Sequence, residues 1–266
     1  MSQKFSSVTE LAGDEISNEQ LLRMHHRYSW ALPYCKNKSV VELACGTGPG
    51  LGMLAKVSKD LAASDYDSEI LNLAKKHYDG NVLLEVVDAT DMPYANNSKD
   101  VIIIFEAIYY LPNVDKFIEE CIRVLKPGGS VLIATANKDL VDFNPSPHSF
   151  SYYGVLELEK IFENYGFDCD FFGFMEVEKK SLKQKIVRFI KTVAVTINIM
   201  PKTMAGKKFF KRIFFGKLVE MPFEISGNEF TYSYPASLTK GISNYDHKVI
   251  YCSASLTILR GSSNDK

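Results

Sequence analysis

Several features of secreted, membrane-spanning and metal-binding proteins are missing from this sequence. No segment offers the ~18 consecutive apolar residues that a membrane-spanning helix needs. Residues 1–15 lack the basic start and apolar stretch of a signal peptide. Cysteine is scarce, and its positions form no Cys-x-x-Cys pair and no cluster with histidine: Cys35, Cys45, Cys121, Cys169 and Cys252. We therefore predict no metal site, free thiols and a location in the reducing cytoplasm.

The near-neutral overall charge conceals two strongly charged parts. Residues 1–178 hold 15 Lys+Arg against 27 Asp+Glu, whereas the basic segment, residues 179–217, holds 12 basic and no acidic residues. Apolar residues recur in this segment at spacings of four and three, which predicts an amphipathic helix: Ile186, Ile190, Val193, Ile197 and Met200. Three roles are open for it: a helical cap on the acidic part, contact with an anionic membrane surface, or contact with nucleic acid or another polyanion.

A glycine-rich turn follows an apolar run that contains an acid. Residues 40–50 read Val-Val-Glu-Leu-Ala-Cys-Gly-Thr-Gly-Pro-Gly, and residues 51–57 continue with helical spacing. This order predicts a strand, a tight turn and a helix start, where backbone amides can approach a ligand closely. A dinucleotide-binding Gly-x-Gly-x-x-Gly loop does not fit, because its third glycine would fall on Leu51. Glu42, four residues before Gly46, instead favours a positively charged ligand, and S-adenosylmethionine (SAM), with sulfonium and ammonium groups, is such a ligand.

Two more acids end the next two predicted strands. Asp65 follows the short buried run 61–64, seventeen residues after Gly48, and Asp88 follows the apolar run 82–87. At the carboxyl ends of the strands of a doubly wound sheet, a carboxylate can accept hydrogen bonds from ribose hydroxyls. Each acid alone fits a helix cap or a turn equally well. Three acids at successive strand ends favour one ligand that contains a nucleoside.

With these motifs, the chain resembles the class I SAM-dependent methyltransferases of the small-molecule type. Residues 99–105 are similar to the fourth strand of that family, and residues 125–133, Leu-Lys-Pro-Gly-Gly-Ser-Val-Leu-Ile, to its turn into the fifth strand. The resemblance covers about residues 20–178 and a last strand near residues 247–259. It implies an α/β fold with a doubly wound, mostly parallel, seven-stranded Rossmann-like sheet.

The resemblance also implies how the cofactor SAM is held. Glu42 and the glycine loop would bind its methionine part, Asp65 its ribose, and Asp88 with Ala89 its adenine. The complete set of expected cofactor-binding residues is Tyr28, Glu42, Ala44, Gly46, Thr47, Gly48, Asp65, Tyr66, Asp88, Ala89, Thr90 and Phe105.

Aromatic and histidine residues mark the expected acceptor side of the site. Four tyrosines follow the fourth and fifth predicted strands and are expected to line the substrate pocket: Tyr109, Tyr110, Tyr152 and Tyr153. A hydroxyl acceptor gains from a general base with a pKa near 7, which favours histidine. His148 is the first candidate and His26 the second, with a capping loop histidine and packing against the cofactor as their alternatives.

The predicted organisation has four parts. Residues 1–35 contain a lid helix (about 18–30), residues 36–178 form the SAM-binding core, residues 179–246 form an insert near the active-site rim, and residues 247–266 form the final core strand and a tail. The predicted activity is methyl transfer from SAM to a hydroxyl of a saccharide or lipid-linked metabolite. Alternatives are a nicotinamide oxidoreductase, a non-catalytic SAM-binding or membrane adaptor, and a protein or nucleic-acid methyltransferase. Nucleic acid is disfavoured, because no Asn/Asp-Pro-Pro-aromatic run follows Phe105. An anionic membrane would place the protein peripherally on the inner membrane face.

Overall fold

The computed structural model describes residues 11–146, 148–177 and 218–257. The basic segment and its predicted amphipathic helix lie outside these ranges, while the rest of the insert, residues 218–246, lies within them. No helix of the described residues is long and apolar enough to cross a membrane.

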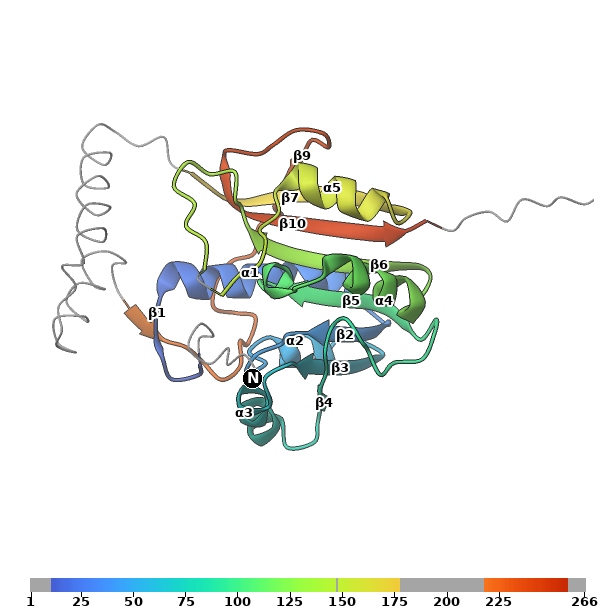
Figure 1. Ribbon diagram of the computed structural model, residues 1–266. Helices are drawn as coiled ribbons and strands as arrows, with labels where there is room; N and C mark the ends of the chain where they lie inside the picture. Colours follow the sequence, from blue (N-terminus) through green and yellow to red (C-terminus); the bar gives the residue numbers. More distant parts are fainter. Residues whose placement is uncertain (1–10, 147, 178–217, 258–266) are drawn as a thin grey trace, which may run out of the picture.

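An eight-stranded sheet runs through the described chain in the order β4-β3-β2-β5-β6-β10-β7-β9 (Figure 1). The strands from β4 to β6 in this order are parallel, β10 is antiparallel to both β6 and β7, and β9 is antiparallel to β7. The bounds are β2 (Ser39–Leu43), β3 (Asp60–Asp65), β4 (Leu83–Val86), β5 (Lys99–Phe105), β6 (Leu125–Ala136), β7 (Phe167–Glu176), β9 (Ala236–Leu238) and β10 (His247–Leu256). This order confirms the predicted doubly wound fold. The expected seven strands were one too few, because β9 adds three residues at the edge beside β7.

Helices cover both faces of the sheet. Side chains alternate between the two faces along each strand, so the apolar central strands present an apolar surface on each side. On the central strands, Val41 and Ile102 pack in the apolar cluster that contains α4 and α5. Val40 and Ile103 point the other way and pack with α1 and α2. The helices are α1 (Asn18–Cys35), α2 (Leu51–Ala55), α3 (Ser68–Tyr78), the short 3₁₀ helix η2 (Ile108–Tyr110), α4 (Val114–Val124) and α5 (Val155–Glu163) (Figure 1).

Helix α1 is anchored firmly to the sheet. A reciprocal capping box between Ser17 and Gln20 begins it, and it continues to Cys35, five residues beyond its expected end. Trp30 is fully buried and stacks on Tyr251 of β10, with ring centroids 4.8 Å apart. The helix predicted as a lid is therefore packed over the centre of the sheet in this structure.

Residues 221–235 form a covering segment that crosses α1 and the glycine loop. It begins after the small sheet that β1 (Glu15–Ser17) makes with β8 (Leu218–Glu220). The Ile225 amide donates to the Pro49 carbonyl over 2.7 Å. Two adjacent histidines of α1 bind its backbone, His25 at Gly227 and His26 at Ser233. This part of the insert therefore lies beside the glycine-loop end of the sheet.

Candidate active site

The glycine loop between β2 and α2 needs backbone conformations that glycine adopts easily. Gly46 and Gly48 have φ of 62° and 74°, in the left-handed region. Ala44 shares this region with φ 54°, a conformation that costs a side-chain-bearing residue about 1 kcal/mol or more and is often found at functional sites. Gly50 has an ordinary φ but no room, because an added Cβ would collide with the Tyr28 ring. The loop therefore packs closely against α1, and it lines the cavity at the carboxyl end of the sheet.

The Asp65 carboxylate, at the end of β3, binds the backbone of the glycine loop. Its two oxygens each accept a backbone amide over 2.8 Å, one from Gly46 and one from Asp67. Burial raises the pKa of the Asp65 carboxyl, although these amides oppose the effect. Each carboxylate oxygen has a further lone pair, so Asp65 can still accept hydroxyl groups of a ligand in the cavity that it lines.

Glu42 is buried behind the loop, and only one of its two carboxylate oxygens accepts a hydrogen bond. The Tyr28 hydroxyl donates to its Oε1 over 2.6 Å, while Oε2 is buried without a hydrogen-bond partner. Burial raises the pKa of Glu42 to about 7, against the lowering effects of Tyr28 and Arg27. Thr47 Oγ1 and Arg27 Nε are buried and unpartnered as well. One carboxylate oxygen, one hydroxyl and one guanidinium nitrogen around this loop thus lack partners, which fits a cofactor with both an ammonium and a carboxylate, as SAM has.

A cavity of about 590 Å³ opens at the carboxyl ends of the parallel strands. At one end, its walls include eight of the residues expected to bind the cofactor: Ala44, Gly46, Thr47, Asp65, Tyr66, Asp88, Ala89 and Phe105. The other four support the walls from behind. Tyr28 binds Glu42, Gly48 accepts the Tyr78 hydroxyl, and Thr90 donates to Asp88.

The other end of the cavity holds charged residues that the sequence analysis did not select. Arg23 of α1 pairs with Glu106 over 3.0 Å, and the Tyr109 hydroxyl donates to the second oxygen of Glu106 over 3.3 Å. Glu106 immediately follows β5 and has φ 52°. Tyr110 and Phe150 complete this wall. Two features of the sequence could have identified these residues. Glu106 is an acid directly after a strand, and the residues of α1 recur with helical spacing along one face: Gln20, Arg23, Met24 and Arg27.

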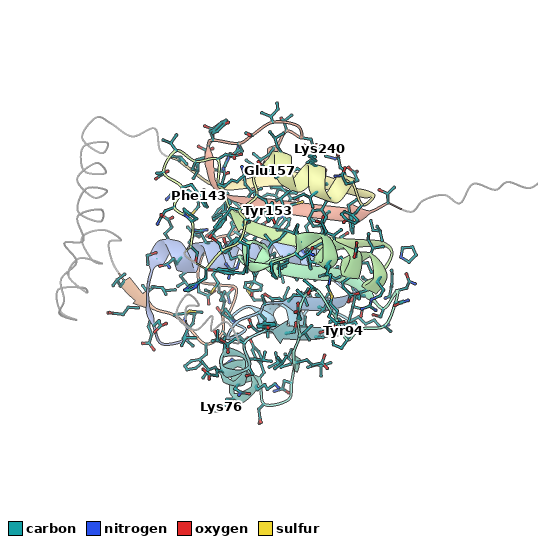
Figure 2. The ribbon with its side chains drawn as sticks, viewed as in Figure 1. Lys76, Tyr94, Phe143, Tyr153, Glu157 and Lys240 are labelled. Atoms are coloured by element: carbon teal, nitrogen blue, oxygen red, sulfur yellow. The ribbon has the colours of Figure 1, made fainter. Side chains whose placement is uncertain are left out.

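Two of the four expected pocket tyrosines do not line the cavity. Tyr109 and Tyr110 line the cavity. Tyr152 stacks on Tyr109, with ring centroids 4.2 Å apart, and its hydroxyl accepts the Ser146 amide. Tyr153 is buried in the apolar cluster beside α5, and Figure 2 shows it near the start of that helix.

The structure does not bring either histidine candidate to the cavity wall. His148 is half-buried in the connection after β6 and is not among the lining residues. His26 is almost fully buried between Phe174 and the covering segment, and its ring stacks on Phe174 with centroids 3.5 Å apart. Over the described ranges, there is no group of three or more His, Cys, Asp or Glu side chains that could hold a metal ion.

A second cavity of about 550 Å³ adjoins the first at Arg23 and Ala136, which line both. Its remaining lining is mostly polar, with some apolar residues: Glu19, Asn137, Leu140, Asp142, Phe143, Asn144, Met175, Glu176, Val177 and Lys248. Figure 2 shows Phe143 on the connection that follows β6. This second cavity, called the annex below, therefore adjoins the Glu106 end of the first and is mostly polar.

A doubly wound sheet with a glycine turn after β2, an acid at the end of β3 and another just after β4 defines a nucleoside-binding protein of the Rossmann-like class. Residues 41–133 match a family model described as "Methyltransferase domain". This match and the geometry of the site support a class I SAM-dependent methyltransferase domain in this part of the chain, with SAM as its cofactor.

Individual relatives agree with this assignment over part of the chain. A probable SAM-dependent methyltransferase of Mycolicibacterium smegmatis is 29% identical over 142 residues, covering 51% of this chain and 54% of that protein. A ubiquinone biosynthesis O-methyltransferase of Mesorhizobium japonicum is 27% identical over 104 residues, covering 38% and 42%. The crystal structure of a SAM-dependent methyltransferase from Archaeoglobus fulgidus shares the fold, with a TM-score of 0.56 and 14% identity over 88% of this chain and 93% of that one. The chain spans about half the length, or less, of the curated relatives it matches.

Proposed function

We propose that this protein transfers the methyl group of SAM to a hydroxyl group of a small-molecule acceptor, a saccharide or a lipid-linked metabolite. One observation carries the proposal. The cavity that Asp65 and Asp88 line continues without a break to Glu106 and two tyrosines. When bound, SAM supplies an activated methyl group, and the residues at the far end need only orient the acceptor and take its proton.

Glu106 is the group best placed to take that proton. Arg23 holds one carboxylate oxygen and the Tyr109 hydroxyl holds the other, so the carboxylate is oriented in the cavity wall. Tyr109 and Tyr110 meet edge to face, with centroids 4.6 Å apart, and offer an aromatic surface against which an acceptor can lie. A base within hydrogen-bond reach of a hydroxyl typically contributes 10²–10⁴-fold to the rate.

The annex supports an elongated acceptor with a polar part. Carboxylate and amide side chains line it, among them Asn144, Glu176 and Glu19, and such groups accept hydrogen bonds from hydroxyls. Ala136 lines both cavities, so replacing it by leucine would reduce the space where they adjoin without touching the glycine loop. We expect this variant to raise KM for the acceptor while leaving the Kd of SAM unchanged. An oxygen acceptor is further supported by the ubiquinone biosynthesis O-methyltransferase among the relatives.

Isotope transfer tests the proposal directly. The full chain is incubated with methyl-labelled SAM and with lipid, glycan, protein and nucleic-acid fractions of cells, with Glu106→Gln as the matched control. We expect label in the lipid or glycan fraction, and none with the control. Label confined to protein or nucleic acid would overturn the acceptor class. SAM binding with no labelled fraction would instead favour a non-catalytic adaptor, and NAD binding without SAM binding an oxidoreductase.

We also propose that the basic segment, residues 179–217, contacts an anionic membrane surface. Its 12 basic and no acidic residues support this, since each cation near such a surface contributes about 1 kcal/mol. The full chain should sediment with phosphatidylglycerol vesicles at low salt and stay in solution with phosphatidylcholine vesicles. Absence of sedimentation with both would exclude the membrane contact.

A further inference from the structure

Two arginines of α1 line the same cavity but differ in their partners. Arg23 is paired with Glu106, as described above. Arg27, one turn later, has a buried Nε without any hydrogen-bond partner. The guanidinium carbon of Arg27 lies 5.6 Å from the centroid of the Tyr28 ring. A buried N–H donor without an acceptor costs free energy, which a ligand that supplies the acceptor recovers.

The acids around Arg27 keep it charged but do not bind it. Burial opposes the charge, yet nearby Tyr28, Glu106 and Glu42 raise the pKa of Arg27 above its ordinary value. Glu106 is already held by Arg23 and Tyr109, and Glu42 by Tyr28. Arg27 is therefore a permanent cation at the cavity wall, and its Nε lacks an acceptor among the described residues.

The strand order shows which part of the ligand lies there. Across the carboxyl edge of the sheet, Asp88 follows β4, Asp65 ends β3, the glycine loop follows β2 and Glu106 follows β5. Neighbouring strands are about 4.8 Å apart, so β4 and β5 lie about 14 Å apart, a span that suits an extended nucleoside with an amino-acid side arm. Arg27 interacts electrostatically with Glu42 of β2 and with Glu106, at the end of this row opposite to Asp88.

We propose that Arg27 binds the carboxylate of the methionine part of SAM. This inference rests on the proposed function, because it requires SAM in this cavity. Guanidinium and carboxylate match in geometry and form paired charge-assisted hydrogen bonds. The ammonium of SAM stands one carbon from its carboxylate, so Glu42, whose Oε2 has no hydrogen-bond partner, complements the second charge of the same group. Arg27 thus distinguishes the intact amino acid from cofactors that lack the carboxylate.

Binding measurements on a matched ligand series test this assignment without any acceptor. Calorimetry would give the Kd of SAM, of S-adenosylhomocysteine and of decarboxylated SAM, which keeps the sulfonium and the amine. Wild-type protein should bind SAM at least 10-fold more tightly than decarboxylated SAM. Arg27→Met should weaken SAM and S-adenosylhomocysteine by about 10- to 100-fold and decarboxylated SAM by less than threefold. Arg27→Lys should recover part of the loss, and Lys240→Met, which removes a cation outside the cavity, should leave the affinities of the wild type unchanged.

Each result that contradicts the expected affinities leads to a different conclusion. No preference for SAM in the wild type would overturn the carboxylate contact without any variant, even if Arg27→Met failed to fold. An equal loss for both ligands in folded Arg27→Met would do the same. Unchanged affinities with lost methyl transfer would assign Arg27 to the acceptor instead. Failure of the wild type to bind SAM at all would overturn the proposed function itself.

Discussion

Acidification should weaken the packing of α1 in the fold, because His26 is buried there and accepts the Tyr251 hydroxyl only in its neutral form. The acceptor at Ser233 is a carbonyl, so Nε2 of His26 must carry the proton that it donates over 2.8 Å. Nδ1 is then the acceptor for the Tyr251 hydroxyl, 2.9 Å away. Burial, with a smaller effect of His25, lowers the pKa of His26 to about 4, against the raising effect of the Ser233 bond.

The magnitude follows from the two pKa values. In the unfolded chain, His26 takes a proton with its ordinary pKa of 6.5, whereas in the fold it does so only near 4. Its contribution to stability is therefore fully present above pH 6.5 and is lost as the pH falls to about 4. Since one pKa unit corresponds to about 1.4 kcal/mol, the loss amounts to about 3 kcal/mol at most.

Urea unfolding between pH 7.5 and pH 4 measures this effect in wild type and in His26→Phe. At pH 7.5 the variant should be about 1–3 kcal/mol less stable, because Ser233 and Tyr251 lose their partner. Below pH 6.5 the two curves should converge, since only the wild type titrates at this position. Parallel curves would refute the reasoning. The same variant should retain methyl transfer at pH 7.5, and loss of turnover with SAM binding intact would restore His26 as a catalytic candidate.

Three further variants test other parts of the site. Glu106→Gln should lower kcat by at least about 100-fold while the Kd of SAM stays within threefold, and equal loss of both would contradict its assignment as the base. Asp65→Asn should weaken SAM about 10- to 100-fold, because it removes a charged acceptor and loosens Gly46; unchanged affinity by calorimetry would exclude Asp65 as a ligand. Burial raises the pKa of Glu42 to about 7, so the cofactor-free protein should lose stability as the pH rises from about 4.3 to 7. The thermal stability of Glu42→Gln should not fall over this pH range. The same pH dependence in both proteins would contradict the raised pKa of Glu42.

The cofactor end of the site was predictable because local sequence determines it. Positive φ at Gly46 and Gly48 requires glycine or a similarly tolerant residue, so the turn leaves a visible pattern in the sequence. Asp67, two residues after the acid that ends β3, caps α3 and accepts the Glu69 and Ile70 amides. Strand ends carry the acids, and parallel strands bring their carboxyl ends to one edge. These residues therefore come together from short-range features alone.

The acceptor end depends on tertiary packing, and there the sequence was a weaker guide. Arg23 and Arg27 face the cavity only because the opposite side of α1 carries Trp30 into the sheet, an orientation that helical periodicity alone does not specify. His26 has the chemistry of a base, but its neighbours Phe174 and Tyr251 come from strands more than a hundred residues away. β9 is too short to show any alternation.

The position of β10 has a consequence for the order in which the protein folds. This strand lies between β6 and β7, pairing with both along most of its length. During synthesis from the N-terminus, β6 and β7 are complete about seventy residues before β10 emerges from the ribosome. Until then, two apolar strand edges lie unpaired, and such edges are prone to pair with other chains. Chaperone dependence and sensitivity to stalled translation should therefore concentrate on the interval between residues 176 and 256.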